Sequence, residues 1–221
     1  MRALTLHFFI ILSLLLSPVF ADEHSHRRPD DIKQYLEHLD SSERDRYQKP
    51  AQVLEALGVK PGMAVADLGS GSGYFTRRFV EAVTDTGIVY AVDVEPEMLA
   101  YAKESVIHMH IAYTAEFILG RLDNPKLPFD SVDLLFVCNT VHHLQDRSKY
   151  FSDLRSALKA GARIAIIDFW PDERSGDLGF PKHHLIPRET VIREMSEAGY
   201  RLAREHSFLP KQYFLEFTST R

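Results

Sequence analysis

An acidic residue followed by alternating glycines is the part of this sequence whose spacing best suits chemistry. Residues 67–73 read D-L-G-S-G-S-G and lie between an apolar run and a segment with Phe75 and Phe79 at helical spacing. The glycines therefore lie where a strand passes into a helix. Glycine tolerates positive φ and has no Cβ, so a ligand can approach the backbone and meet the N–H groups at the helix start. This pattern is typical of a loop that binds a nucleoside or a nucleotide.

A second acid lies at the distance that such a site requires. The strand-like residues 88–92 end at Asp93, twenty residues after Gly73. A Rossmann-type unit places at this point the carboxylate that hydrogen-bonds the ribose hydroxyls. The dinucleotide pattern G-x-G-x-x-G fits the first two glycines of the loop, but Tyr74 stands at the third position. The spacing therefore predicts Asp93 as a ribose ligand and disfavours NAD.

The motif D-x-G-x-G-x-G, together with Asp93, resembles motif I of the class I S-adenosylmethionine-dependent methyltransferases. The resemblance covers roughly residues 45–221 and includes the run into a central strand at 127–137 and a strand at 163–168. It implies S-adenosylmethionine as the cofactor, with the loop bent around the amino acid part of the cofactor. The cofactor-binding residues expected on this basis are Asp67, Gly69, Ser70, Gly71, Gly73, Asp93, Val94, Leu122, Asp123, Asn139 and Tyr47.

Leu122, Asp123 and Tyr47 are among the expected residues that lie away from the loop. The resemblance implies that Asp123 contacts the adenine amino group and that Leu122 packs near the ring, although Arg121 stands where family members often carry the acid. Tyr47, together with Gln48, is expected to line the site; the alternative for Tyr47 is a hydrophobic contact before a helix.

Two histidines follow the central strand. His142 and His143 lie just past its carboxyl end, where ligands bind in open α/β sheets. Methyl transfer from a sulfonium needs no acid, but a phenol or enol acceptor is helped by a base that works near neutral pH. We predict that one of the pair orients or deprotonates the acceptor. The alternative is that one histidine packs and the other is solvated.

The remaining histidines predict no metal site. His183 and His184 lie in a loop that either covers the acceptor pocket or is polar surface, and no spacing resembles a zinc pattern. Cleavage before Asp22 would make His24 the third residue, a position that can bind copper or nickel, which we interpret as coincidence.

The order of elements predicts an α/β fold: a Rossmann-like, seven-stranded, mostly parallel sheet with helices on both faces and the last strand antiparallel. Residues 50–221 form the predicted methyltransferase domain, with a turn at 160–162 and a terminal hairpin. Residues 22–49 are predicted to be a helical lid over the cofactor site, since Ile32, Tyr35, Leu36 and Leu39 have helical spacing.

The N-terminus predicts export. Arg2, an apolar run over residues 8–16 and a small residue at Ala21 are typical of a signal peptide over residues 1–21, cleaved before Asp22. The protein would then be periplasmic or secreted; an uncleaved membrane anchor would also leave the domain facing outward. The single thiol, Cys138, excludes an internal disulfide and is expected to be buried.

The composition of the chain limits the classes of molecule that the protein is expected to bind. The chain has 221 residues, 45% of them hydrophobic, which suits one domain with a substantial core. A formal net charge of −5 and the lack of a Lys/Arg-rich run argue against nucleic acid as a partner. The sequence therefore predicts an exported S-adenosylmethionine-dependent methyltransferase that acts on a small-molecule or membrane-associated methyl acceptor, with association to a membrane surface as a further expectation. The alternatives are a non-catalytic S-adenosylmethionine-binding module and a nicotinamide-dependent oxidoreductase.

Overall fold

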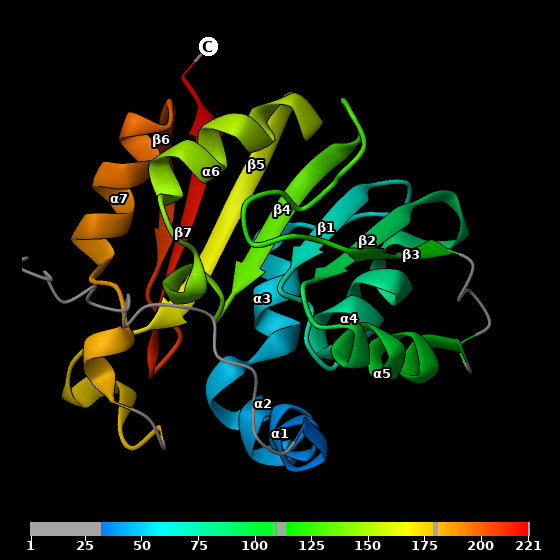
Figure 1. Ribbon diagram of the computed structural model, residues 1–221, viewed down its shortest axis with the longest axis horizontal. Coiled ribbons are helices and arrows are strands. Elements are labelled where there is room, and N and C mark those ends of the chain that lie inside the picture. Colours follow the sequence, from blue (N-terminus) through cyan, green and yellow to red (C-terminus); the bar gives the residue numbers. More distant parts are fainter. Residues whose placement is uncertain (1–31, 108, 110–113, 179–180, 221) are drawn as a thin grey trace, which may run out of the picture.

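The computed structural model describes residues 32–107, 109, 114–178 and 181–220 (Figure 1). The predicted signal peptide and His24 lie outside these residues. The strands are β1 (Ala64–Leu68), β2 (Ile88–Asp93), β3 (Ala115–Leu119), β4 (Val132–Cys138), β5 (Leu158–Phe169), β6 (Tyr200–His206) and β7 (Gln212–Ser219). The α-helices are α1 (Ile32–Leu39), α2 (Ser42–Gln48), α3 (Pro50–Leu57), α4 (Tyr74–Val83), α5 (Pro96–Ile107), α6 (Arg147–Asp153) and α7 (Arg188–Glu197). Short 3₁₀ helices include η3 (Val141–His143), η5 (Glu173–Ser175) and η6 (Lys182–His184).

All seven strands belong to one sheet with the order β3-β2-β1-β4-β5-β7-β6. The strands from β1 to β5 pair in parallel, and β7 is antiparallel to both of its neighbours, β5 and β6. Six strands therefore share one direction and the last strand runs against them. The predicted fold is confirmed, including the terminal hairpin of β6 and β7.

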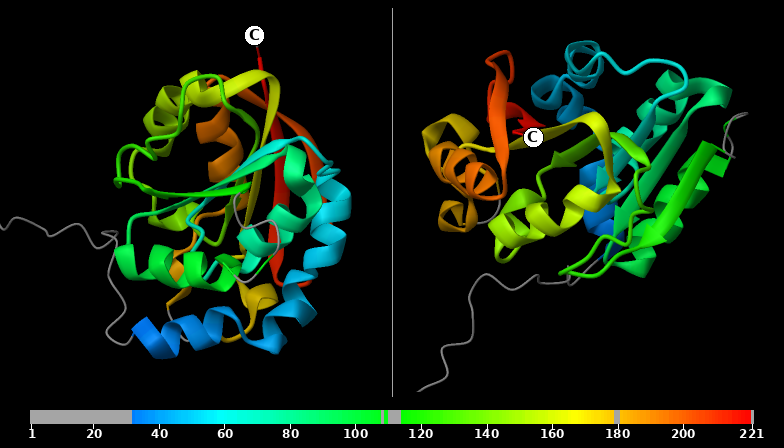
Figure 2. Two further views of the ribbon diagram at one scale, coloured as in Figure 1. Left: turned by 90° about the vertical axis from the view of Figure 1, so that its right-hand side faces the viewer. Right: turned by 90° about the horizontal axis from the view of Figure 1, so that it is seen from above.

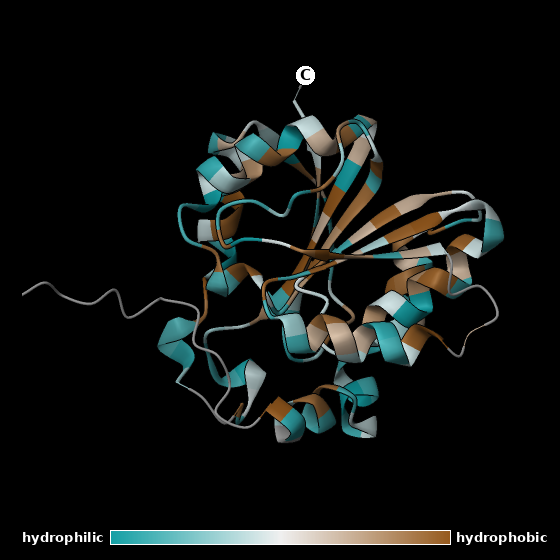
Figure 3. Ribbon diagram, turned by 45° about the vertical axis from the view of Figure 1, so that its right-hand side comes forward, coloured by the Kyte–Doolittle hydropathy of each residue, from teal (hydrophilic) through white to brown (hydrophobic). Residues whose placement is uncertain are grey.

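Side chains alternate between the two faces of the sheet and bury both. In β5, Ile164 and Ile166 pack in the cluster that includes residues of α6 and α7, whereas Ala165 and Ile167 pack with residues of α3, α4 and α5. Helices consequently cover both faces (Figure 2), and the strands between them are largely apolar (Figure 3). Within the described residues, no helix has the length and apolar character needed to cross a membrane.

The sequence predicted a turn at residues 160–162, and the structure has a bulge within a strand there instead. Residues 158–169 are one strand, and the turn residues form a bulge inside it. Val132 of β4 pairs with Leu158, whereas Leu134, two residues later, pairs with Arg163. Gly161 takes a φ of 80°, which lets the extra residues loop out before the strand resumes.

The N-terminal residues form the helix α1 over Ile32–Leu39, where helical spacing was predicted, followed by α2. This α1–α2 pair lies beside the carboxyl ends of the parallel strands (Figure 1). Lys49, with a φ of 44°, ends α2, and Pro50 begins α3. The chain therefore turns sharply between the pair and the helix that packs on the sheet.

Candidate functional site

The site is built at the junction of β1 and β4, the two central strands. From β1 the chain crosses to β2 on one side, and from β4 it crosses to β5 on the other. The connections therefore leave these two strands in opposite directions, which opens a crevice at their carboxyl ends. The glycine loop follows β1 and Asn139 follows β4, so both predicted elements meet at this crevice.

Three glycines of the loop have backbone conformations that favour glycine. Gly69, Gly71 and Gly73 have φ values of 75°, 53° and 78°. A Cβ on Gly69 would lie 2.2 Å from Oγ1 of Thr140, which follows β4. A Cβ on Gly71 would lie 3.2 Å from a methyl carbon of Leu39 in α1. The loop is therefore a cradle of bare backbone between β4 and α1, as a closely held cofactor requires.

Asp93 is fixed against this loop. Its Oδ2 accepts a hydrogen bond of 2.8 Å from the N–H of Gly71, and its Oδ1 accepts one of 3.0 Å from the N–H of Glu95. The carboxylate therefore has a set position between the first loop and the start of α5. Each carboxylate oxygen can accept more than one hydrogen bond, so this geometry is compatible with a ribose diol. Val94 is half-buried beside it.

Asp67 and Ser70 are both buried in the loop. Asp67 accepts a 2.7 Å hydrogen bond from Oγ1 of Thr76, and burial raises its pKa to about 6. The Oγ of Ser70 has no hydrogen-bond partner among the described residues. Both side chains therefore place polar atoms under the cradle, and the Ser70 hydroxyl has capacity for a ligand.

Three carboxamides meet beside the crevice. Nε2 of Gln212, at the start of β7, donates to Oδ1 of Asn139 at 2.6 Å and lies 3.4 Å from Oε1 of Gln48. Asn139 has a φ of 54°, a conformation that asparagine tolerates better than most residues. Tyr47 lies with its ring centroid 5.8 Å from that of Phe169, and burial raises the pKa of its phenol. The sequence predicted Asn139 and Tyr47 here but missed Gln212.

Leu122 and Asp123 are not brought to this cluster. Leu122 is 55% exposed, and Asp123 pairs with Arg121 at 3.2 Å in a solvent-exposed turn after β3. Their adenine contacts stay a prediction.

His142 forms a buried hydrogen-bonded pair with Asp168. Its Nδ1 lies 2.9 and 2.8 Å from the two carboxylate oxygens of Asp168, and its side chain is 6% exposed. Asp168, near the end of β5, also accepts hydrogen bonds from the N–H groups of Phe169 and His142. His143 is exposed, with its ring centroid 4.2 Å from that of His142. Sequence reasoning missed Asp168, although an acid ending an apolar strand was the available signal.

Arg44 is a third residue that sequence reasoning missed, after Gln212 and Asp168. It lies on α2, is 8% exposed, and stacks on the ring of Tyr74 with its Cζ 3.9 Å from the ring centroid. Arg44, Tyr47 and Gln48 have helical spacing, but polar residues at such spacing in a polar segment predict a solvent-facing side. In the structure, this polar side of α2 faces the interior of the protein.

The other histidines that the structure describes belong to no group of side chains suited to a metal. No group of three His, Cys, Asp or Glu within the described ranges could hold a metal ion. His183 and His184 lie on η6 with their ring centroids 4.3 Å apart.

The residues of the crevice fit S-adenosylmethionine. The cradle has no room for a Cβ at Gly69, Asp93 is held where the ribose is expected, and the Ser70 hydroxyl is buried without a partner among the described residues. Tyr74 fills the third position of the dinucleotide pattern with a buried ring, which does not suit NAD.

Comparisons with known proteins agree with this fit. A methyltransferase domain family matches residues 66–166. Over 122 residues the chain is 33% identical to a ubiquinone/menaquinone biosynthesis C-methyltransferase of Ectopseudomonas mendocina, covering 53% of this chain and 46% of that protein. Over 169 residues it is 25% identical to the protein of the same name in Vibrio campbellii, covering 74% and 65%. The chain thus spans about half to two thirds of the length of these curated relatives.

A solved structure matches over almost its whole length. The S-adenosylmethionine-dependent methyltransferase from Aquifex aeolicus superimposes with a TM-score of 0.78 and 30% identity, covering 85% of this chain and 97% of that one. Because it covers 85% of this chain, this match extends beyond residues 66–166. With its fold, its glycine loop and this relative, the chain belongs to the class I S-adenosylmethionine-dependent methyltransferases, whose cofactor is S-adenosylmethionine.

Proposed function

We propose that this protein is an exported methyltransferase that methylates a small hydroxylated acceptor of the phenol or quinol type, free or held in a membrane. The buried pair of His142 and Asp168, at the carboxyl edge of the sheet, carries this proposal. The names of the curated relatives, which refer to ubiquinone and menaquinone biosynthesis, support the acceptor class.

The residues divide into those that hold the cofactor and those that prepare the acceptor. The glycine loop and Asp93 hold the cofactor, which when bound supplies an electrophilic methyl group and leaves as a neutral thioether. Because a neutral thioether is a good leaving group, the protein needs to supply no acid and contributes alignment instead. A hydroxylated acceptor has a proton to lose, and removing it makes the acceptor a better nucleophile.

His142 is the proposed base for that proton. Asp168 accepts a hydrogen bond from Nδ1 of the imidazole, which fixes the tautomer in which Nε2 takes up a proton. The same carboxylate stabilises the imidazolium that forms. Asp168 is thus a positioning residue, because it acts through His142 and does not itself meet the acceptor.

The test is a methyl-transfer assay with labelled S-adenosylmethionine and a panel of acceptors: a simple phenol, a catechol, a benzoquinol and a naphthoquinol with prenyl chains. We expect methylated product from one of these acceptors. His142→Gln should lower kcat by roughly 100-fold or more, the usual contribution of a general base. Asp168→Asn should lower kcat while leaving the KM for S-adenosylmethionine unchanged, and Asp168→Glu should recover part of the loss.

The adjacent exposed histidine supplies a matched control, since His143→Gln should retain most of the activity. Full activity in His142→Gln would refute the role of the base. Cofactor binding without product from any acceptor would favour the rival function, a module that binds S-adenosylmethionine and transfers nothing.

Export is supported by residues 1–21 of the sequence, with their basic residue, apolar run and small residue at Ala21. Expression of the full chain in a bacterium, followed by fractionation and N-terminal sequencing, tests it. We expect periplasmic protein that begins at Asp22. Protein that begins at Met1 in the cytosolic fraction would contradict export.

A further inference from the structure

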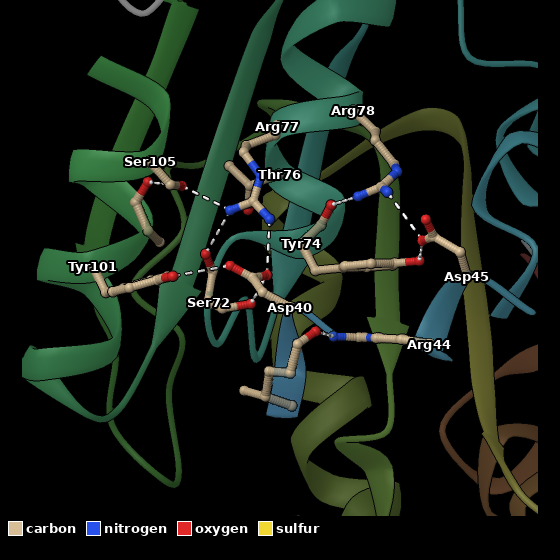
Figure 4. A network of polar contacts seen from close by, with 12 residues as sticks. Asp40, Arg44, Asp45, Ser72, Tyr74, Thr76, Arg77, Arg78, Tyr101 and Ser105 are labelled. Carbon is tan, nitrogen blue, oxygen red and sulfur yellow. Dashed lines mark hydrogen bonds and ion pairs between the residues drawn. The ribbon is translucent and has the colours of Figure 1, made fainter. Parts of the chain in front are cut away.

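The α1–α2 pair is fastened to α4 and α5 by polar contacts (Figure 4). Asp40, which follows α1, accepts hydrogen bonds from Arg77 at 2.8 Å, from Ser72 at 2.7 Å and from Tyr101 at 3.2 Å. Asp45, in α2, binds Arg78 at 3.2 Å and the hydroxyl of Tyr74. These contacts fix the pair directly over the glycine loop, with Leu39 against Gly71.

Arg44 projects from this pair into the interior. Its guanidinium lies against one side of the Tyr74 ring, and that of Arg78 lies on the other, at 3.9 and 4.0 Å from the ring centroid (Figure 4). One nitrogen, Nη1, donates to the carbonyl of Leu39 at 3.0 Å. The Nε atom is buried and has no hydrogen-bond partner among the described residues. These contacts hold the guanidinium in a fixed plane. They leave its Nε–H group without an acceptor among the described residues.

Arg44 also forms no salt bridge with any carboxylate in the described part of the chain. Asp40 and Asp45 pair instead with Arg77 and Arg78, and Glu43, next to Arg44 in sequence, is exposed. A buried cation without a paired anion is unfavourable. A ligand carboxylate would therefore gain more at this position than at a solvent-exposed arginine.

The position of this cation is the crevice itself. Its positive charge acts on Asp67, in β1, and on Cys138, at the end of β4, and opposes the rise that burial causes in the pKa of each. The guanidinium also lies 3.9 Å from the ring of Tyr74, the residue that follows the glycine loop, which places it beside the crevice. Asp93, expected to hold the ribose, follows β2 on the far side of β1.

These positions match the two ends of the cofactor. If Asp93 held the ribose of S-adenosylmethionine, the amino acid end of the cofactor would have to lie across the glycine loop, on the side where Arg44 is found. That end carries an α-carboxylate, and the planar guanidinium of arginine suits a carboxylate better than other side chains do.

We propose that Arg44, carried by the α1–α2 pair, is the receptor for the α-carboxylate of the cofactor. The pair then completes the cofactor site, and it selects ligands that have an amino acid end. This inference rests on the cofactor assigned above. It adds a residue outside the matched domain, which covers residues 66–166.

Two ligands that differ in the carboxylate test this role by calorimetry. S-adenosylhomocysteine has the amino acid end, whereas 5′-methylthioadenosine has the same nucleoside and sulfur without it. We expect Arg44→Met to weaken S-adenosylhomocysteine binding by roughly 10- to 100-fold, the range for a lost charge-assisted hydrogen bond. Binding of 5′-methylthioadenosine should stay within a factor of about three, since its contacts do not include Arg44.

Two further variants separate recognition from folding. Arg44→Lys keeps the charge but loses the planar fork, so its affinity for S-adenosylhomocysteine should lie between those of the wild type and Arg44→Met. Arg46→Met, at an exposed position of the same helix, should bind both ligands as the wild type does. The thermal midpoint of each variant shows whether it is folded.

The inference would be overturned if Arg44→Met lowered the affinity for both ligands equally or for neither. Wild-type protein that binds neither ligand would overturn the cofactor assignment as well. Binding is measured without an acceptor, so failure of the proposed acceptor class would leave this result unaffected.

Discussion

The burial of Asp67 is unfavourable for the stability of the folded protein. Its carboxyl group is 3% exposed, and the loss of hydration raises its pKa from 3.8 to about 6 despite the Thr76 hydrogen bond and the charge of Arg44. At neutral pH the group is ionised, so the folded protein carries a buried carboxylate that the unfolded chain would keep hydrated.

Asp67→Asn should change how stability depends on pH. Between about pH 4 and 6 the folded wild type binds more protons than the unfolded chain, so its stability falls as pH rises and levels off above about pH 6. The asparagine variant has no such slope. Relative to the wild type, it should gain up to about 3 kcal/mol between pH 4 and pH 7, on the order of two pKa units at about 1.4 kcal/mol each.

Urea denaturation at the two pH values measures this difference, and Asp133→Asn serves as a control because Asp133 is half-buried and pairs with Lys159. An identical pH slope for the wild type and Asp67→Asn would show that Asp67 ionises normally.

Gly69→Ala should be much more destabilising than Gly161→Ala. Both glycines have a similar φ, 75° and 80°, so both substitutions carry the cost of a left-handed conformation, about 1 kcal/mol. At Gly161 a Cβ would meet nothing within 4 Å, whereas at Gly69 it would meet Thr140 at 2.2 Å. Urea denaturation gives the free energy of unfolding of each variant. The loss in Gly69→Ala beyond that in Gly161→Ala therefore measures the contact between the loop and Thr140.

Thr140→Ala removes Oγ1 and Cγ2, the atoms that the new Cβ would meet at 2.2 and 2.5 Å, and leaves the Cβ of residue 140 at 2.9 Å. In the double variant, the cost of Gly69→Ala should fall toward that of Gly161→Ala. Additive costs for Gly69→Ala and Thr140→Ala would argue that Thr140 does not restrict the loop.

The sequence predicted the residues whose roles depend on local spacing. The glycines and Asp93 lie near strand ends, so their position follows from neighbouring residues alone. Arg44, Asp168 and Gln212 reach the site from distant elements, and each is an ordinary polar residue within its own segment. Their convergence depends on how α2, β5 and β7 pack, which no local pattern encodes.

At the scale of elements, the α1–α2 pair differs from the rest of the fold. The strands and the other helices are held by two apolar clusters, whereas this pair is held largely by Asp40, Asp45 and their partners. Partly exposed ion pairs contribute little free energy each. The pair should therefore open at a lower free energy than the sheet unfolds.

Asp40→Ala should make this difference measurable. The change removes three hydrogen bonds to Arg77, Ser72 and Tyr101. Amide hydrogen exchange in residues 32–48 should speed up by roughly 5- to 30-fold, for a loss of about 1–2 kcal/mol in local stability. Exchange in β1 and β4 should be unchanged.

The control is Glu43→Ala, which removes an exposed acid of α2. Equal acceleration in both variants would indicate general fraying of the helix. Acceleration throughout the sheet in Asp40→Ala would mean that the pair and the sheet unfold together.

Most elements could be predicted because their apolar spacing is regular. The bulge in β5 could not, since Ala160, Gly161 and Ala162 have the composition of a turn and only the pairing with β4 shows that the strand resumes. The inward polar side of α2 was missed for a related reason: a helix that buries polar groups for a ligand has the pattern of a helix that exposes them to water.

At the scale of the whole molecule, the rate at which the thiol of Cys138 reacts measures how often the crevice opens to solvent. The thiol is buried, and burial raises its pKa to about 12, so almost none is thiolate at pH 8. We expect native protein to react with a disulfide reagent at pH 8 only as fast as the crevice opens, and urea-unfolded protein to react within seconds to minutes. Saturating S-adenosylhomocysteine should slow the native reaction further. Immediate reaction of the native protein would place the thiol in contact with solvent.

The place of β7 in the sheet has a consequence for biosynthesis. This strand is made after β6 but lies between β5 and β6, so the ribosome releases both of its neighbours before the strand that joins them. Until residues 212–219 emerge, strand β5 has an open edge and the nascent chain cannot close its core. This order of synthesis therefore delays folding of the sheet until the last strand has left the ribosome.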